Sequence, residues 1–143
     1  FGVVVVLLVI TIRHYMLIES YGTDRNGDGK ADVISIYDDG KLVSEKYDND
    51  FDGYFETHYT VGRNGFWLKG TIDRSQSGKP DVIMRYALGR LDVVEFYDLA
   101  TGGLIKRDIY DRFGVKTREE IDQDGDGVFE RVGHFDKYER PLP

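Results

Sequence analysis

Apolar and polar residues alternate along most of the chain after residue 32, in short runs rich in Val, Ile, Tyr and Phe. Clusters of Asp, Asn and Gly separate these runs. Because successive side chains of a strand point to opposite faces, the runs predict strands and the clusters predict turns. About nine strands are expected, and they cover residues 33–37, 41–47, 54–59, 66–72, 82–86, 91–97, 104–110, 115–121 and 128–132.

Each strand that returns from a tight turn divides into an apolar and a polar face. In the first return strand Val43, Glu45 and Tyr47 share one face, whereas Ser44 and Lys46 share the other. Short turns join such strands into an antiparallel meander, whose apolar face must curl, close or pack against something else. In the later return strands the apolar face is expected to carry Phe66, Leu68, Ile72, Leu91, Val93, Tyr97, Val115 and Ile121, and the polar face Lys69, Thr71, Lys116, Arg118 and Glu120.

The turns that precede each outgoing strand repeat at a fixed distance. An Asp begins them at positions 24, 48, 73, 98 and 122, and a Gly stands at positions 29, 53, 78, 103 and 127. The spacing is 24, 25, 25 and 24 residues. Matches in register at a fixed period identify a tandem repeat, so residues 22–143 are predicted to form one β-hairpin repeat domain with a 24–25 residue period.

Three of these loops carry oxygen-bearing side chains at positions 1, 3, 5 and 9. The most complete runs from Asp122 to Glu130, and its Gly at position 6 permits the sharp turn that brings positions 1, 3 and 5 together. Carboxylates gathered around one point repel one another unless a cation lies between them, and calcium (Ca2+) accepts irregular oxygen geometry. The candidate side-chain ligands are Asp24, Asn26, Asp28, Asp32, Asp48, Asp50, Asp52, Glu56, Asp122, Asp124, Asp126 and Glu130.

The other two loops match this pattern less well. Loop 73–81 keeps an Asp at each end but has Ser75 and Ser77 inside, and loop 98–106 keeps only Asp98 and the Gly. A turn without metal is the expectation for these two loops, since Asp, Ser and Gly favour turns by themselves. The same metal-free interpretation stays open as the alternative for the three acidic loops.

The pattern D-x-[DN]-x-D-G-x-x-[DE] resembles the calcium loops of integrin-type FG-GAP repeats, in which the loop links two strands. The resemblance covers residues 24–32, 48–56 and 122–130, and it implies additional ligation by the position-7 carbonyls of Lys30, Tyr54 and Val128. FG-GAP repeats are far longer, and the short hairpin period is similar to that of MORN-type repeats, which stack hairpins into an elongated sheet. An EF-hand is disfavoured, because strands flank the loops and position 12 is never Glu.

The first 12 residues, from Phe1 to Ile12, carry no charge. As a helix they span about 18 Å, and extension to Ile18 gives about 27 Å, close to the roughly 30 Å hydrocarbon core of a membrane. The expectation is a membrane-anchoring helix over residues 1–21, with lipid contact through residues 1–18 and Arg13 reaching the interface. A buried strand or two is the first alternative, and a signal-peptide core is the second.

A chain that starts with Phe, continues with an apolar run and then forms a β-rich domain resembles a type IV pilin. That resemblance implies a subunit whose N-terminal helices bundle into a filament. The chain departs from the pilin pattern at Val5, where that family has Glu, and its stretch before Gly22 is shorter than a pilin helix.

Composition narrows the classes of function. The net charge of −7 is largely accounted for by the acidic loops, and it argues against nucleic acid as a partner, which needs a basic face. The chain has no Cys, and it contains no nucleophile elbow, phosphate loop or zinc-protease motif. The histidines His14, His58 and His134 share no spacing, and Trp67 is either a surface aromatic or a platform for a partner or carbohydrate.

The sequence therefore predicts a non-enzymatic, membrane-anchored, calcium-binding structural or interaction protein with its repeat domain on the periplasmic or extracellular side. The expected role is that of an accessory subunit, which stabilises a larger membrane complex by binding its other protein subunits. The alternative is a pilin-like subunit of an extracellular filament, in which identical subunits are the partners.

Overall fold

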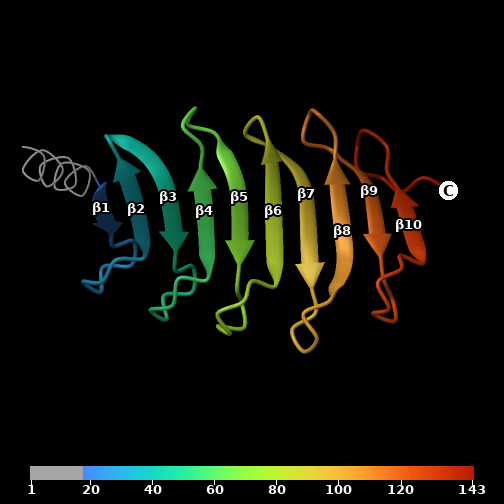
Figure 1. Cartoon of the computed structure of the whole chain (residues 1–143), viewed down its shortest axis with the longest axis horizontal. Helices are drawn as coiled ribbons and strands as arrows, with labels where there is room; N and C mark the ends of the chain where they lie inside the picture. The colour runs from blue at the N-terminus through green and yellow to red at the C-terminus, as the bar shows by residue number, and fades with distance from the viewer. Residues whose placement is uncertain (1–17) are drawn as a thin grey trace, which may run out of the picture.

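The computed structural model describes residues 18–143, which form one antiparallel sheet of ten strands (Figure 1). The spatial order of the strands is their order in the chain, so every strand pairs with the next one. The predicted mainly β meander of hairpins is confirmed. The strands are β1 Ile18–Thr23, β2 Val33–Asp38, β3 Lys41–Tyr47, β4 Thr57–Val61, β5 Trp67–Ile72, β6 Val82–Ala87, β7 Arg90–Tyr97, β8 Leu104–Tyr110, β9 Lys116–Ile121 and β10 Arg131–His134.

A strand that the sequence did not predict stands at the N-terminal edge of the sheet. β1 pairs with β2 in an unbroken register from Ile18 opposite Asp38 to Thr23 opposite Val33. The prediction that an anchoring helix reaches residue 21 is therefore wrong for residues 18–21, because backbone pairing with β2 decides their conformation. Residues 1–17, the rest of that predicted helix, lie outside the described residues. Within residues 18–143 no helix has the length and apolar character needed to cross a membrane.

Two predicted strands begin later than expected, because the loops before them are longer. β4 starts at Thr57 and not at Tyr54, and β10 starts at Arg131 and not at Val128. After β10 the chain turns back, and Phe135 forms a single bridge with Pro141. The last repeat thus ends in a bridge and not in a return strand.

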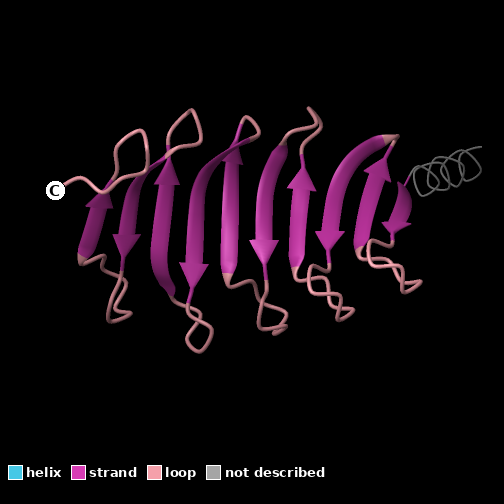
Figure 2. Ribbon diagram, turned by 180° about the vertical axis from the view of Figure 1, so that it is seen from behind, coloured by secondary structure: helices cyan, strands magenta, loops and turns pink. Residues whose placement is uncertain are grey.

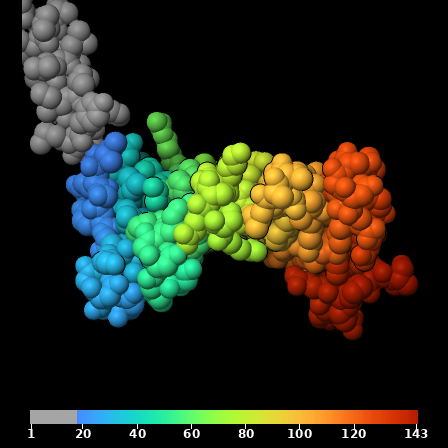
Figure 3. All heavy atoms as spheres, turned by 90° about the horizontal axis from the view of Figure 1, so that it is seen from below, coloured from blue at the N-terminus to red at the C-terminus, as the bar shows by residue number. Residues whose placement is uncertain are grey.

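The described residues form a single-layer sheet with its connections and a short C-terminal segment after β10 (Figures 2 and 3). In this part of the chain only Val61, Val82 and Val94 are buried apolar side chains. Most of the other buried side chains are carboxylates, and several belong to the repeat loops. The described chain therefore has almost no hydrophobic core. Contacts between side chains on each face, and contacts among the repeat loops, must stabilise the sheet.

One face of the central strands carries a cluster of aromatic rings, here termed the aromatic face. Tyr59 stacks on Trp67 with 4.8 Å between ring centroids, and Tyr86 meets Trp67 edge-on at 5.6 Å. Gly70 lies beneath them, since a Cβ there would come within 2.7 Å of both the Met84 side chain and the Tyr59 ring. These rings cover the backbone of a sheet on which no second layer of described residues packs.

β-Bulges change which residues reach the aromatic face. The register shifts between Arg85 and Tyr86, so that Val94 pairs with Met84 and shares its face. The prediction that Val93 lies on the apolar face is therefore wrong. A further shift between Ile109 and Tyr110 places Lys116 opposite Tyr110, although the sequence placed Lys116 on the polar face. Each bulge adds one residue to one strand, which reverses the alternation beyond it.

Candidate metal-binding loops

All five repeat loops emerge at the same end of the strands, below the sheet in Figure 1. This row of loops is here termed the loop edge. They connect β1 to β2, β3 to β4, β5 to β6, β7 to β8 and β9 to β10, whereas shorter turns join the other strand pairs at the opposite edge. Because each repeat contains one hairpin, the fold places the candidate ligands of successive repeats in one row.

Two hydrogen bonds fix the shape of the loops 24–32, 48–56, 73–81 and 122–130. The position-1 carboxylate accepts the backbone N–H of the position-6 Gly at 2.7–2.8 Å. The position-9 carboxylate accepts the backbone N–H of position 2 at 2.7–2.9 Å. The position-6 glycines have φ between 80° and 94°, a left-handed conformation that other residues adopt only with strain. The serine-containing loop thus folds like the three acidic loops.

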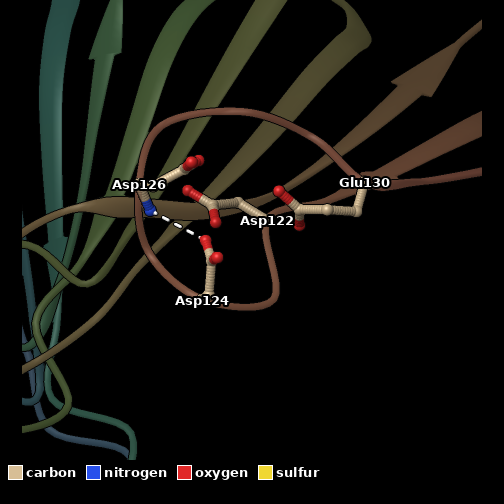
Figure 4. A group of neighbouring side chains, drawn as sticks. All are labelled: Asp122, Asp124, Asp126 and Glu130. Atoms are coloured by element: carbon tan, nitrogen blue, oxygen red, sulfur yellow. Dashed lines mark hydrogen bonds between the residues drawn. The ribbon is translucent and has the colours of Figure 1, made fainter.

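Loop 122–130 brings all four of its predicted side-chain ligands together (Figure 4). One carboxylate oxygen from each of Asp122, Asp124, Asp126 and Glu130 lies within 4.8 Å of all the others. Asp122 is 4% exposed, and two backbone N–H groups of the loop orient its carboxylate. The other three carboxylates are exposed. Four oxygens at this separation suit a hard cation of the size of calcium.

Loop 48–56 gathers Asp48, Asp50 and Asp52 in the same way. Asp48 is 2% exposed, and its Oδ2 accepts the N–H of Gly53 at 2.8 Å, but its Oδ1 has no hydrogen-bond partner. Burial raises the pKa of Asp50, and the negative charges of Asp52, Glu56 and Asp48 raise it further. A buried carboxylate oxygen without a partner is costly, so a hydrogen-bond donor or a cation at this point would stabilise the loop.

The structure does not bring every predicted ligand into these groups. Glu56 stays out of the group in loop 48–56, because both the backbone N–H and the side-chain amide of Asn49 hold its carboxylate. In loop 24–32 no three carboxylates gather, since position 3 is Asn26 and Asp32 accepts two backbone N–H groups at 2.7 and 3.2 Å.

The other predicted side-chain ligands of loop 24–32 accept hydrogen bonds from backbone N–H groups of the same loop. Backbone N–H groups of Gly29 and Gly27 lower the pKa of Asp24. Asn26 Oδ1 accepts the N–H of Asp28 at 2.8 Å. This loop therefore satisfies its oxygens internally to a larger extent than loop 48–56 does.

Position 7 behaves alike in the three acidic loops. The N–H groups of Lys30, Tyr54 and Val128 donate to the position-5 carboxylate at 2.7–2.8 Å. Their carbonyls, which the FG-GAP resemblance implies as ligands, remain an expectation.

Loop 73–81 satisfies its position-1 carboxylate without a cation. Burial pushes the pKa of Asp73 up, but the Tyr54 hydroxyl and the N–H groups of Ser77 and Gly78 outweigh burial, so this pKa is lowered. The Tyr54 hydroxyl donates to Asp73 Oδ2 at 2.6 Å. Loop 98–106 is different again, since Asp98 accepts only from Ala100 and Thr101 in a tighter turn.

Neighbouring loops contact one another along the edge. Arg25 of the first loop donates to the backbone carbonyl of Asp48 in the second at 2.7 Å. Gln76 of the third loop donates to Asp52 of the second, and Tyr54 donates in the opposite direction to Asp73. No local pattern in the sequence indicates these contacts, because each joins residues about one repeat apart.

A second pair of chemically interesting residues lies away from the loops. Ser44 Oγ and His58 Nε2 are 2.7 Å apart on the face opposite the aromatic face. In the described residues no hydrogen bond holds the other ring nitrogen of His58, so the pair lacks the orienting group of a catalytic triad. The sequence missed this pair because 14 residues separate its members.

Comparison with known proteins identifies the fold but no family. No protein-family model and no curated protein sequence matches the chain. A similar solved structure is that of accessory secretory protein 1, 2 and 3 in Streptococcus pneumoniae, with a TM-score of 0.53 and 15% sequence identity. The match covers 74% of this chain and 19% of that chain, so this sheet corresponds to about a fifth of the other protein. At this identity the likeness concerns the fold alone.

Proposed function

We propose that this chain is a non-enzymatic interaction module in which calcium bound by the acidic loops clamps the edge of a single-layer sheet. The observation that carries the proposal is the buried Oδ1 of Asp48, which has no hydrogen-bond partner in a loop that gathers three carboxylates. A divalent cation at that point would satisfy this oxygen and neutralise its neighbours. Oxygen-rich loops of this kind bind calcium over a wide range of affinities.

The charges around the loops support the same conclusion. In the described residues no Lys or Arg forms an ion pair with Asp50, Asp52, Asp124 or Asp126. Elsewhere in the sheet, Asp108, Glu119 and Glu120 all have such partners. Carboxylates left close together without counter-charges favour a cation from solution.

The single-layer sheet supports an accessory role. Both faces are open in the described chain, and apolar side chains such as Phe66, Trp67 and Leu68 are 39–50% exposed. Exposed apolar surface of this kind favours a partner that covers it. We extend the proposal to an accessory subunit of a larger complex, anchored through its first residues on the outer side of a membrane, where calcium is abundant.

Calcium titration of the full chain in mild detergent tests the proposal. Calcium should raise the melting temperature measured by circular dichroism, because a ligand bound only by the folded state stabilises it. Asp126→Ala should remove the share of one site, whereas Asp92→Ala, an equal charge change on β7 outside the loops, should leave the calcium response unchanged. A melting curve that chelator does not move would refute the calcium clamp.

A further inference from the structure

Six side chains on one face of strands β3 to β5 form a compact group, here termed the basic patch. Cross-strand register sets their arrangement, since Lys46 stands opposite His58 and His58 opposite Thr71. In the adjacent row Ser44 stands opposite Thr60 and Thr60 opposite Lys69. Opposite residues of an antiparallel pair share a face, so all six project from the side opposite the aromatic face. The basic patch comprises Ser44, Lys46, His58, Thr60, Lys69 and Thr71.

Basic side chains adjoin one another in this patch. Lys46 lies directly across from His58, and Lys69 lies directly across from Arg85 on β6. Of these two pairs, Lys69 and Arg85 carry like charges in directly opposed positions, an arrangement that destabilises a sheet.

Counter-charges are present beside the patch but not within it. Arg85 forms an ion pair with Glu95 at 3.0 Å, and Arg107 on β8 forms one with Glu120 at 3.2 Å. In the described residues neither Lys46 nor Lys69 has an ion-pair partner. On this face the arginines of β6 and β8 therefore have acidic partners, whereas the lysines of β3 and β5 do not.

Hydroxyl groups complete the patch, and those of Ser44 and Thr71 already have hydrogen-bond partners within it. Ser44 Oγ lies 2.7 Å from His58 Nε2, and the Thr71 hydroxyl donates to the His58 carbonyl at 3.5 Å. Thr60 and Lys69 are exposed, and the other four residues are half-buried. The Cα atoms of Lys46 and Lys69 stand roughly 12 Å apart, because two strand spacings and an offset of two residues along the strand separate them. Acidic side chains of an extended segment can reach both at once.

We infer that the basic patch binds an acidic segment of a partner protein. A short acidic segment meets only the patch, because charges more than about 10 Å away are largely screened at ordinary ionic strength. A long polyanion such as nucleic acid would also meet the acidic surface of a chain with a net charge of −7. The interaction uses the strands and not the loop edge, so it is independent of the calcium sites.

The test measures binding of a fluorescent polyglutamate peptide to the full chain by anisotropy, with and without calcium. The double variant Lys46→Gln/Lys69→Gln should weaken binding by about tenfold or more, because it removes both charge contacts. The control Lys79→Gln/Lys137→Gln makes the same charge change outside the patch and should stay close to the unmodified chain. Circular dichroism checks that each variant is folded, and added salt should weaken binding.

A chemical-shift change at the His58 imidazole on addition of the peptide would support the location. Absence of polyglutamate binding at low salt, or equal loss in both double variants, would overturn the proposal. A single-stranded DNA oligonucleotide that binds more tightly than the peptide would overturn the assignment to an acidic protein segment. Polyglutamate binding that disappears when calcium is removed would place the binding at the loops and would likewise overturn the proposal.

Discussion

The substitution Asp48→Asn tests whether the Asp48 carboxylate binds a cation or only stabilises the folded loop. Asp48 Oδ2 accepts the N–H of Gly53 at 2.8 Å, and Oδ1 is buried without a hydrogen-bond donor beside Asp50 and Asp52. An asparagine keeps the bond to Gly53 through its amide oxygen. Its NH2 group replaces the unsatisfied oxygen and donates to the neighbouring carboxylates.

The expected free-energy change has opposite signs in the two states of the loop. A buried polar atom without a partner costs about 1–3 kcal/mol, so Asp48→Asn should stabilise the calcium-free chain by roughly that amount. A site filled at about 100 times its dissociation constant contributes about 2.7 kcal/mol, and the variant should lose most of this contribution. Urea unfolding followed by circular dichroism, with calcium and with chelator, measures both quantities.

Asp122→Asn is the matched control, because it alters the same loop position in a different environment. Both Asp122 oxygens accept a backbone N–H, from Gly125 at 2.7 Å and from Gly127 at 2.8 Å. An amide can accept only one of these, so this variant should lose about 1–3 kcal/mol even without calcium. If Asp48→Asn destabilises the chain equally with calcium and with chelator, the Asp48 carboxylate serves the fold and the reasoning fails.

Two further predictions concern other parts of the sheet. Tyr54→Phe removes the 2.6 Å hydrogen bond to Asp73 and should lower the urea midpoint of unfolding. The control Tyr138→Phe should not lower it, because the Tyr138 hydroxyl makes no hydrogen bond in the described residues. Equal midpoints for the two variants would contradict the link between loops. The pKa of His58 is held below 6.5 by burial, Lys46 and Lys69, so the unfolded chain binds its proton more readily. The stability of the unmodified chain should therefore fall more steeply than that of His58→Gln as pH drops through 6.5, and parallel pH curves would show that His58 does not contribute.

The loop motifs show where local sequence was sufficient and where it was not. The motif fixes loop shape, because positions 1, 6 and 9 lie within one turn and their hydrogen bonds are local. Loops 48–56 and 122–130 nevertheless differ, since Asn49 holds Glu56 away whereas Glu130 joins its group. The residue that decides whether the position-9 carboxylate joins its group stands at position 2, where the motif allows any residue.

The sequence by itself determined the period, the alternation of loop and strand and the common edge on which the loops stand. Each of these follows from interactions within one repeat: left-handed glycines, a two-residue periodicity and short turns. Only the tertiary structure decided which side chains share a face, because the bulges near Tyr86 and Tyr110 reverse the alternation without altering the composition. It also decided the burial of Asp48 and the gathering of Lys46, His58 and Lys69, since these depend on pairing between residues that the chain keeps far apart.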